Sequence, residues 1–121
     1  MTIPVNNNSA ENLADKKCIP CEGGMPAMDL DQAKIWLGRI DSAWKLNSEG
    51  QKISREFIFK GFNKTMGFVN AIAWIANQES HHPDLEVSYD RCTVHFQTHA
   101  VKGLTENDFI CAKKIDRLLI N

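Results

Sequence analysis

The sequence has no long hydrophobic run and no excess of charge of either sign. No apolar stretch approaches the ~20 residues that a helix needs to cross a bilayer, which excludes a membrane-spanning helix. The 14 Lys and Arg are scattered along the chain and are matched by 15 Asp and Glu. A protein that binds duplex DNA usually gathers a basic excess on one face. We therefore expect neither a membrane contact nor a direct nucleic-acid contact.

A secretion signal is also missing, and cysteine is scarce. The first 17 residues lack the apolar stretch of a signal peptide, which favours a cytoplasmic protein. In that compartment the four cysteines are expected to be reduced thiols. Cys18 and Cys21 form a CxxC motif, but Cys92 and Cys111 supply no second pair with the spacing of a structural zinc site. An incidental pair, a zinc ligand pair and a disulfide remain open for the CxxC.

A length of 121 residues allows one domain with a single core. Residues 1–27 show no helical or strand periodicity and contain a run of three Asn, several prolines and the pair Gly23-Gly24. We expect residues 1–27 to be a mobile N-terminal arm and residues 28–121 to be the domain.

Within the domain, capping residues and apolar periodicity predict the order α-β-β-α-β-β-α. The predicted segments are a helix over 29–40, a hairpin over 44–59, a helix over 61–80, a hairpin over 85–98 and a helix from Thr105 onward. Asp29 and Gln32 have capping-box spacing at the first helix, and Thr105 and Asp108 have it at the last. Two hairpins imply an α+β fold, in which a four-stranded antiparallel sheet carries helices on one face.

The helix over 61–80 has an apolar stripe that covers about half of its circumference. The stripe comprises Phe62, Met66, Val69, Ile72, Ala73 and Ala76. Phe68, Trp74 and Ile75 extend this surface beyond what one sheet requires. A lone sheet with two exposed edges also invites pairing with a second copy. These features predict a homo-oligomer, either a dimer or a tetramer.

Three of the four histidines fall near expected element ends. His81 and His82 precede Pro83, and because proline disfavours the helical conformation of the residue before it, the long helix should end at this dipeptide. His99 ends the last expected strand, and counting by two from His95 places it on the face opposite that strand's apolar residues. A helix end and a strand end then form a cleft in which His81, His82 and His99 meet.

Imidazole titrates near neutral pH, so a coupled cluster can hold an acid and a base together, as a dehydration site requires. The spacing alone does not decide this, since the dipole favours a histidine in a last helical turn and a histidine on a polar strand face can simply be solvated. A zinc site with three His ligands is another alternative. Adjacent imidazoles such as those of His81 and His82 seldom point at one ion, so we expect no metal.

Six positions, taken in their order and spacing, resemble the signature of the pterin-4a-carbinolamine dehydratase family: His81, His82, Pro83, Tyr89, His99 and Asp108. The resemblance extends to Trp44 and to residues 57–63, and it covers about residues 29–120. The sequence departs from the family pattern at Asn77, four residues before His81, where many members have an acidic residue.

The resemblance implies a dehydratase that converts a 4a-hydroxytetrahydropterin to the quinonoid dihydropterin and water, in tetrahydrobiopterin recycling. It implies that His81, His82 and His99 are catalytic, that the pterin is the substrate and that no cofactor is needed. The implied substrate-binding residues are His81, His82, Pro83, Thr98, His99, Ala100, Val101 and Trp44. For Trp44, a role as a core anchor of the first strand is an equal alternative. Thr105 and Asp108 are assigned to the structural cap of the last helix.

The resemblance also implies partners. An aromatic amino-acid hydroxylase would supply the substrate, and the chain would associate with itself. Some animal members of the family also act as dimerisation partners of a homeodomain transcription factor. A non-catalytic dimerisation or coactivator-type binding module is therefore the alternative function, and it would not depend on the three histidines.

Overall fold

The computed structural model describes residues 10–19 and 26–119. Three α-helices and four strands follow the order that the sequence predicts. A short 3-10 helix precedes them and another lies before the last helix. The elements are η1 (Ala10–Asp15), α1 (Leu30–Leu37), β1 (Lys45–Leu46), β2 (Ile53–Ile58), α2 (Phe62–Glu79), β3 (Asp84–Val87), β4 (Arg91–Phe96), η2 (His99–Val101) and α3 (Glu106–Arg117).

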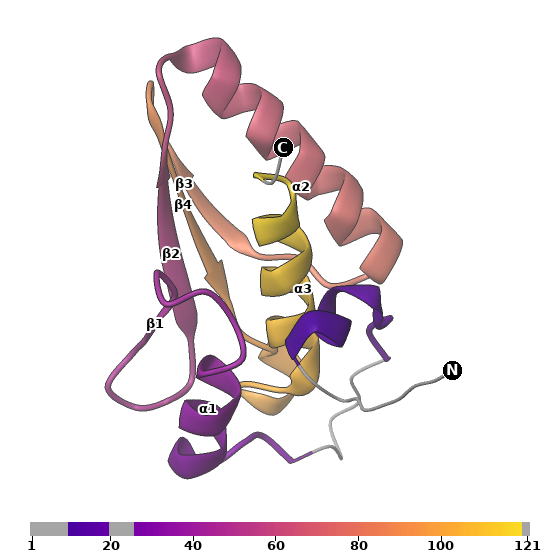
Figure 1. Ribbon diagram of the computed structural model, residues 1–121. Coiled ribbons are helices and arrows are strands. Elements are labelled where there is room, and N and C mark those ends of the chain that lie inside the picture. The colour runs from indigo at the N-terminus through magenta and orange to yellow at the C-terminus, as the bar shows by residue number, and fades with distance from the viewer. Residues whose placement is uncertain (1–9, 20–25, 120–121) are drawn as a thin grey trace.

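The strands form one antiparallel sheet in the order β1-β2-β4-β3. Figure 1 shows α2 and α3 on the same side of this sheet, which confirms the α+β fold with helices on one face. Along β4, Cys92, Val94 and Phe96 are buried and alternate with less buried neighbours. This period of two turns the apolar residues toward the helices. His95 therefore lies on the other face, where it contacts Ser54 of β2 and Glu86 of β3.

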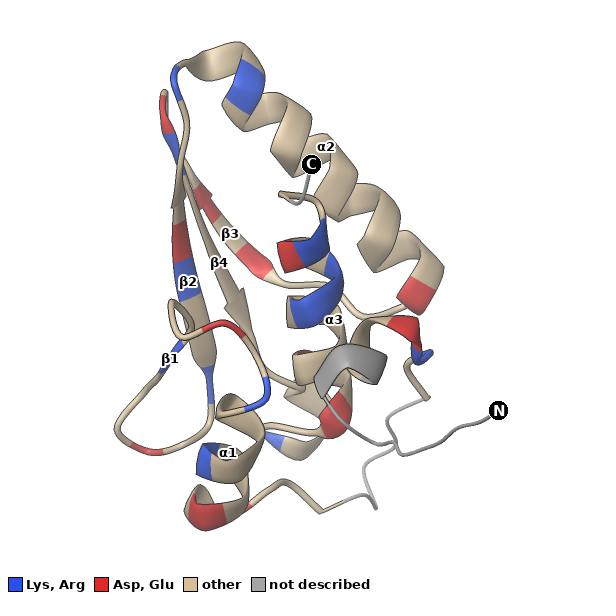
Figure 2. Cartoon of the chain, in the orientation of Figure 1, with Lys and Arg blue, Asp and Glu red and all other residues tan. Residues whose placement is uncertain are grey.

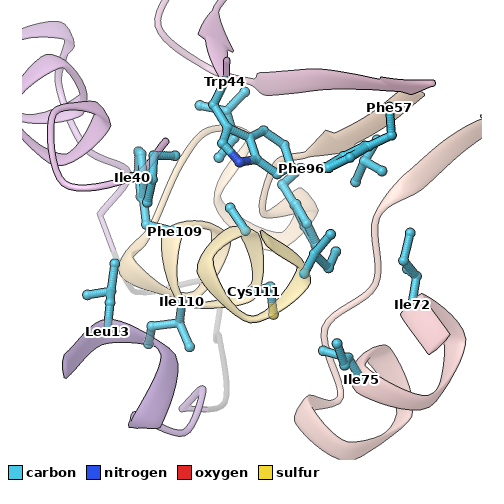
Figure 3. Close-up of a cluster of buried hydrophobic side chains, with 14 of the residues drawn as sticks. Leu13, Ile40, Trp44, Phe57, Ile72, Ile75, Phe96, Phe109, Ile110 and Cys111 are labelled. Atoms are coloured by element: carbon cyan, nitrogen blue, oxygen red, sulfur yellow. The ribbon is translucent and has the colours of Figure 1, made fainter. Parts of the chain in front are cut away.

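Aromatic side chains from strands and helices fill the core (Figure 3). The Trp44 ring lies 6.2 Å from the rings of both Phe57 and Phe96. Phe57 in turn lies 4.6 Å from Phe68 of α2. Each of these rings buries a large apolar surface, so their packing stabilises α2 against the central strands β2 and β4.

The buried stripe of α2 differs from the predicted one. Thr65, Phe68, Ile72 and Ile75 are buried, whereas Phe62 is 53% exposed. Phe68 and Ile75 therefore face the sheet of their own chain and do not extend the surface as expected. Because α2 is apolar around most of its circumference, several stripes fit its sequence, and the sheet selects one of them.

The described part of the N-terminal arm packs against α3. Leu13 is 3% exposed, and Figure 3 shows it beside Ile110. Lys114 Nζ donates a hydrogen bond of 2.7 Å to the Ala14 carbonyl. A single apolar residue leaves no periodicity in the sequence, but it can still complete a core that other elements begin. Residues 1–9 and 20–25 of the arm, Cys21 among them, lie outside the described residues.

The remaining elements follow the prediction with small shifts at their ends. The capping boxes at Asp29 and Thr105 are both present. Strand β4 ends at Phe96, earlier than expected, and Tyr89 lies in the turn between β3 and β4. No helix in the described ranges is both long and apolar enough to cross a membrane.

Candidate functional site

The end of α2 determines the position of the first candidate histidine. Ser80 ends the helix in the left-handed conformation, with φ 52° and ψ 39°. The His81 N–H then donates to the Ala76 carbonyl at 3.2 Å, which closes the last turn. Residues 80–83 connect α2 directly to β3, so the helix ends at Glu79, four positions before Pro83, in agreement with the predicted stop near this proline.

The His81 ring is held on two sides. Its Nε2 lies 2.7 Å from Asp108 Oδ1, and the His81 side chain is only 10% exposed. The ring also stacks on Phe96 at a centroid distance of 5.9 Å and an interplanar angle of 6°. An ionised carboxylate can only accept a hydrogen bond, so in the neutral imidazole this contact selects the tautomer with the proton on Nε2 and with Nδ1 as the acceptor.

Asp108 contacts three other segments of the chain while it is fully buried. Its Oδ2 accepts hydrogen bonds from the Thr98 hydroxyl at 2.8 Å and from the Thr105 N–H at 3.0 Å. Thr98 and Thr105 also share a hydroxyl contact of 2.9 Å. These bonds offset the cost of burying the carboxylate. The predicted cap of α3 is therefore confirmed, and the same side chain also orients His81, a role that sequence reasoning missed.

A short closed loop carries His99. The Thr98 N–H donates to the Gly103 carbonyl at 2.7 Å, and the Gly103 N–H returns a bond of 3.4 Å. Between them, His99–Val101 form η2, and Lys102 ends it with φ 57°. His99 and Ala100 are exposed, whereas Thr98 is 2% exposed. The sequence predicts that His99 ends the last strand. In the structure His99 instead begins the 3-10 helix η2.

The structure links the two candidate segments through Asp108. One carboxylate oxygen binds His81, and the other binds Thr98, the residue directly before His99. His82 is exposed at the same turn as His81, and Pro83 is half-buried. In this site the His81 imidazole is fixed by a hydrogen bond and a stacked ring, whereas the imidazoles of His82 and His99 are exposed on neighbouring loops.

Trp44 is a core residue. It is 1% exposed, and its indole Nε1–H donates to Asp116 Oδ2 at 2.9 Å. The Asp116 carboxylate also binds Arg55 at 2.8 Å, and burial raises its pKa despite the bonds from Trp44 and Arg55. This burial fits the core-anchor alternative for Trp44, and a role for Trp44 in binding the pterin stays a prediction.

A cavity of about 410 Å³ lies beside His81. The arm forms part of its wall through Cys18 and Ile19, together with Glu79 at the end of α2 and Asn107 of α3. Sequence reasoning missed this contribution, because a few polar contacts of an irregular segment leave no sequence pattern.

Glu79 joins the arm to both helices. It accepts a 2.8 Å hydrogen bond from the Cys18 N–H and lies 3.5 Å from Lys114 Nζ. Burial acts to raise the pKa of Glu79, but the Cys18 bond and the Lys114 charge outweigh it, so the pKa lies below its ordinary value of 4.5. Glu79 is thus a buried anion between the arm and α3. Asn77, at the position where many family members have an acidic residue, is exposed.

His95, the fourth histidine, is separate from this site. Its Nδ1 lies 2.6 Å from the Ser54 hydroxyl, and its Nε2 contacts Glu86. Among residues 10–19 and 26–119, no group of three or more His, Cys, Asp or Glu side chains is arranged to hold a metal ion.

Comparison of the sequence with known proteins gives a consistent result. A model of the family described as pterin 4 alpha carbinolamine dehydratase matches residues 26–118. A Nitrosomonas eutropha protein, provisionally named a pterin-4-alpha-carbinolamine dehydratase, is 51% identical over 110 residues, which are 91% of this chain and 96% of that protein. A Legionella pneumophila protein with the same provisional name is 54% identical over 110 residues, 91% of this chain and 97% of that protein.

Solved structures share the fold. A Brucella melitensis protein described as a transcriptional coactivator/pterin dehydratase has a TM-score of 0.71 and 29% identity, over 76% of this chain and 97% of that chain. A pterin dehydratase-like protein identified as a RuBisCO assembly factor in the alpha-carboxysome has a TM-score of 0.55 over 63% of this chain and 88% of that chain. At 17% identity, the second likeness concerns the fold alone.

Proposed function

Because the chain belongs to the pterin-4a-carbinolamine dehydratase family, we propose that it removes water from a 4a-hydroxytetrahydropterin by histidine acid-base catalysis. The observation that carries the proposal is the chain of contacts from His81 through Asp108 to Thr98, which connects the two segments that bear the candidate histidines. A family likeness alone does not establish a reaction, since one fold can host several functions.

The proposed reaction requires only proton transfers. The C4a–O bond breaks, the departing hydroxyl gains a proton to become water, and the proton on ring N5 is removed, which leaves the quinonoid dihydropterin. An imidazolium would supply the first proton, and a neutral imidazole would accept the second. Each correctly positioned group typically contributes about a hundred- to ten-thousand-fold in rate. The scheme uses no cofactor and no metal.

We assign the base to His81 and the acid to His99. The bond to Asp108 keeps the proton on Nε2 of His81, so the Nδ1 lone pair is available for the N5 proton. His99 is exposed on η2 and can exchange protons with solvent. His82 and Pro83, with residues 98–101, would orient the pterin. Asp108 is then a positioning residue that acts through His81.

The functional context follows from the substrate. A 4a-hydroxytetrahydropterin is the product of an aromatic amino-acid hydroxylase, so we place the protein after such an enzyme in tetrahydrobiopterin recycling in the cytoplasm. Self-association into a dimer or tetramer is part of the same proposal. The uncharged outer face of α2 supports it, because the charged residues of α2, Lys64 and Glu79, lie near its two ends (Figure 2).

One observation favours a second candidate function. The Brucella melitensis relative is described as both a transcriptional coactivator and a pterin dehydratase. Trp74 of α2 is 65% exposed, and a large exposed aromatic on an uncharged helix face is a feature of protein-binding surfaces. A binding module of this kind would need the α2 face and would tolerate loss of the three histidines.

Stopped-flow measurement of the decay of a freshly generated 4a-hydroxytetrahydropterin tests the proposal. We expect the protein to accelerate the decay over the spontaneous rate, and each of His81→Ala and His99→Ala to lower kcat/KM at least about a hundred-fold. His95→Gln is the matched control, because His95 lies on the opposite face of the sheet, and it should retain full activity. No acceleration by the wild-type protein would refute the enzymatic function and leave the binding module.

A further inference from the structure

Two thiols from distant parts of the chain lie in contact beside His81. Cys18 Sγ is 3.5 Å from Cys111 Sγ, although 93 positions separate them in the sequence. Cys111 is fully buried in α3, whereas Cys18 is partly exposed. The CxxC spacing pairs Cys18 with Cys21, whereas the structure places Cys18 against Cys111.

Hydrogen bonds on both sides of Cys18 hold it at this place. The Cys18 N–H donates to Glu79, as described above, and the Cys18 thiol contacts the Asn107 carbonyl at 3.7 Å. The next residue, Ile19, exchanges two hydrogen bonds with the Asn107 side-chain amide, at 3.1 and 2.7 Å. These contacts keep the backbone at residues 18–19 against the first turn of α3, one helical turn before Cys111, so the two sulfur atoms are held in contact.

We propose that Cys18 and Cys111 form a redox site, in which a peroxide oxidises the pair to a disulfide that fixes the arm to α3 next to His81. The partly exposed Cys18 is the thiol that a small oxidant in solution can reach. The buried Cys111 is the resolving thiol. Neither residue takes part in the proposed proton transfers, so the inference does not rest on the proposed function.

The chemistry balances in two steps. Hydrogen peroxide oxidises the Cys18 thiol to a sulfenic acid and is reduced to water. The Cys111 sulfur then attacks the sulfenic sulfur, the S–O bond breaks, and the oxygen leaves as a second water with the proton of the Cys111 thiol. Two thiols and one peroxide therefore become one disulfide and two waters. The hydrogen bond with Cys18, followed by burial, raises the pKa of the Cys111 thiol, which fits its place as the second and not the first sulfur to react.

The disulfide would change the neighbourhood of His81 directly. The Cys111 thiol contacts the His81 carbonyl at 4.0 Å, and Cys18 and Ile19 line the cavity beside His81. In the reduced protein, non-covalent contacts hold this wall, namely hydrogen bonds and the packing of Cys18 against the core. In the oxidised protein a covalent bond would hold it, and the bond would also constrain the unfolded chain across a long loop.

Peroxide treatment of the full-length protein, an acidic quench with thiol alkylation and tryptic peptide mapping test the proposal. Cleavage at Lys17, Lys34, Lys102 and Lys113 releases Cys18 within residues 18–34 and Cys111 within residues 103–113. We expect these two peptides to be cross-linked within one chain. The cross-link should persist in Cys21→Ser, disappear in Cys111→Ala and be reversed by dithiothreitol.

A second readout follows the effect on the fold. The oxidised protein should unfold at a higher urea concentration than the reduced protein, and this shift should be absent in Cys111→Ala, a change that suits a helix interior. Recovery of Cys18 joined only to Cys21, or over-oxidised, with Cys111 still a free thiol would overturn the proposal. A cross-link found only between two chains would overturn it as well.

Discussion

Asp108 combines two tasks in one carboxylate. It closes the N-terminus of α3 through the Thr105 N–H, and it orients a histidine that comes from the end of α2. Capping-box spacing reveals the first task, because both partners lie within four residues of each other. The second task depends on His81, 27 positions away, and only the folded chain brings the two together.

The first prediction concerns this carboxylate. Asp108→Asn replaces one acceptor oxygen by an NH₂ donor, so His81 loses the contact that fixes its tautomer. We expect kcat/KM for dehydration to fall at least about ten-fold and the free energy of unfolding to fall by about 1–3 kcal/mol. Glu106→Gln is the control, because Glu106 lies in the same turn but pairs with Lys16 at the surface. Full activity in Asp108→Asn would show that Asp108 is a structural cap alone.

The second prediction concerns the buried anion Glu79. The pKa of Glu79 is lowered in the folded protein, so the stability it contributes is present above its ordinary value of 4.5 and is lost as the pH falls through the folded pKa. We expect Glu79→Gln to cost about 1–3 kcal/mol at neutral pH. Urea unfolding of the two proteins from pH 7 to pH 3 should show this difference shrinking below pH 4.5. A difference that does not depend on pH would contradict the assignment.

At the scale of elements, the sequence predicts whatever depends on local spacing. Both capping boxes, the end of α2 before Pro83 and the strand alternation of β4 follow from residues that lie a few positions apart. The buried stripe of α2 and the packing of η1 cannot be predicted from such local spacing. They depend on which surfaces the sheet and α3 offer, and a helix that is apolar on most sides fits more than one such surface.

The third prediction tests the observed register of α2. Ile72 is 1% exposed and faces the sheet, whereas the neighbouring Ala73 is exposed. We expect Ile72→Ala to lower the free energy of unfolding by about 2–5 kcal/mol, because it leaves a cavity in the core. Ala73→Ser should change it by less than about 1 kcal/mol. Equal losses in the two variants, measured by urea unfolding, would contradict the register.

At the scale of the whole molecule, residues 10–19 and 26–119 leave an uncharged surface on α2 uncovered. Phe62 and Trp74 are 53% and 65% exposed, although apolar side chains of this size are usually buried. A two-fold contact between copies of the chain would cover both side chains and is the commonest arrangement of soluble homo-oligomers.

The fourth prediction follows from this surface. In sedimentation equilibrium at micromolar concentration, the wild-type protein should form a particle larger than the 13.7 kDa chain. Trp74→Glu should weaken the association, because it places a charge on the apolar face, and Gln51→Glu, at an exposed position in the turn between β1 and β2, serves as a charge-matched control. A wild-type particle of 13.7 kDa at all concentrations would refute the prediction.

The candidate site shows the same division between local and long-range information. The sequence names His81, His82 and His99 by their place at element ends and by family resemblance. It does not reveal that Asp108 and Thr98 connect the segments, that the arm lines the cavity or that Trp44 is buried. These features depend on tertiary packing between residues far apart in the chain, for which spacing carries no signal.

The most direct measurement of the central claim is a double-mutant cycle on His81 and His99, with kcat/KM for dehydration of a 4a-hydroxytetrahydropterin determined by stopped flow. Residues that act as one catalytic unit lose most of their joint effect when either one is removed. We therefore predict that the double variant His81→Ala/His99→Ala is scarcely slower than the slower single variant. Losses that multiply independently in the double variant would contradict a shared acid-base site.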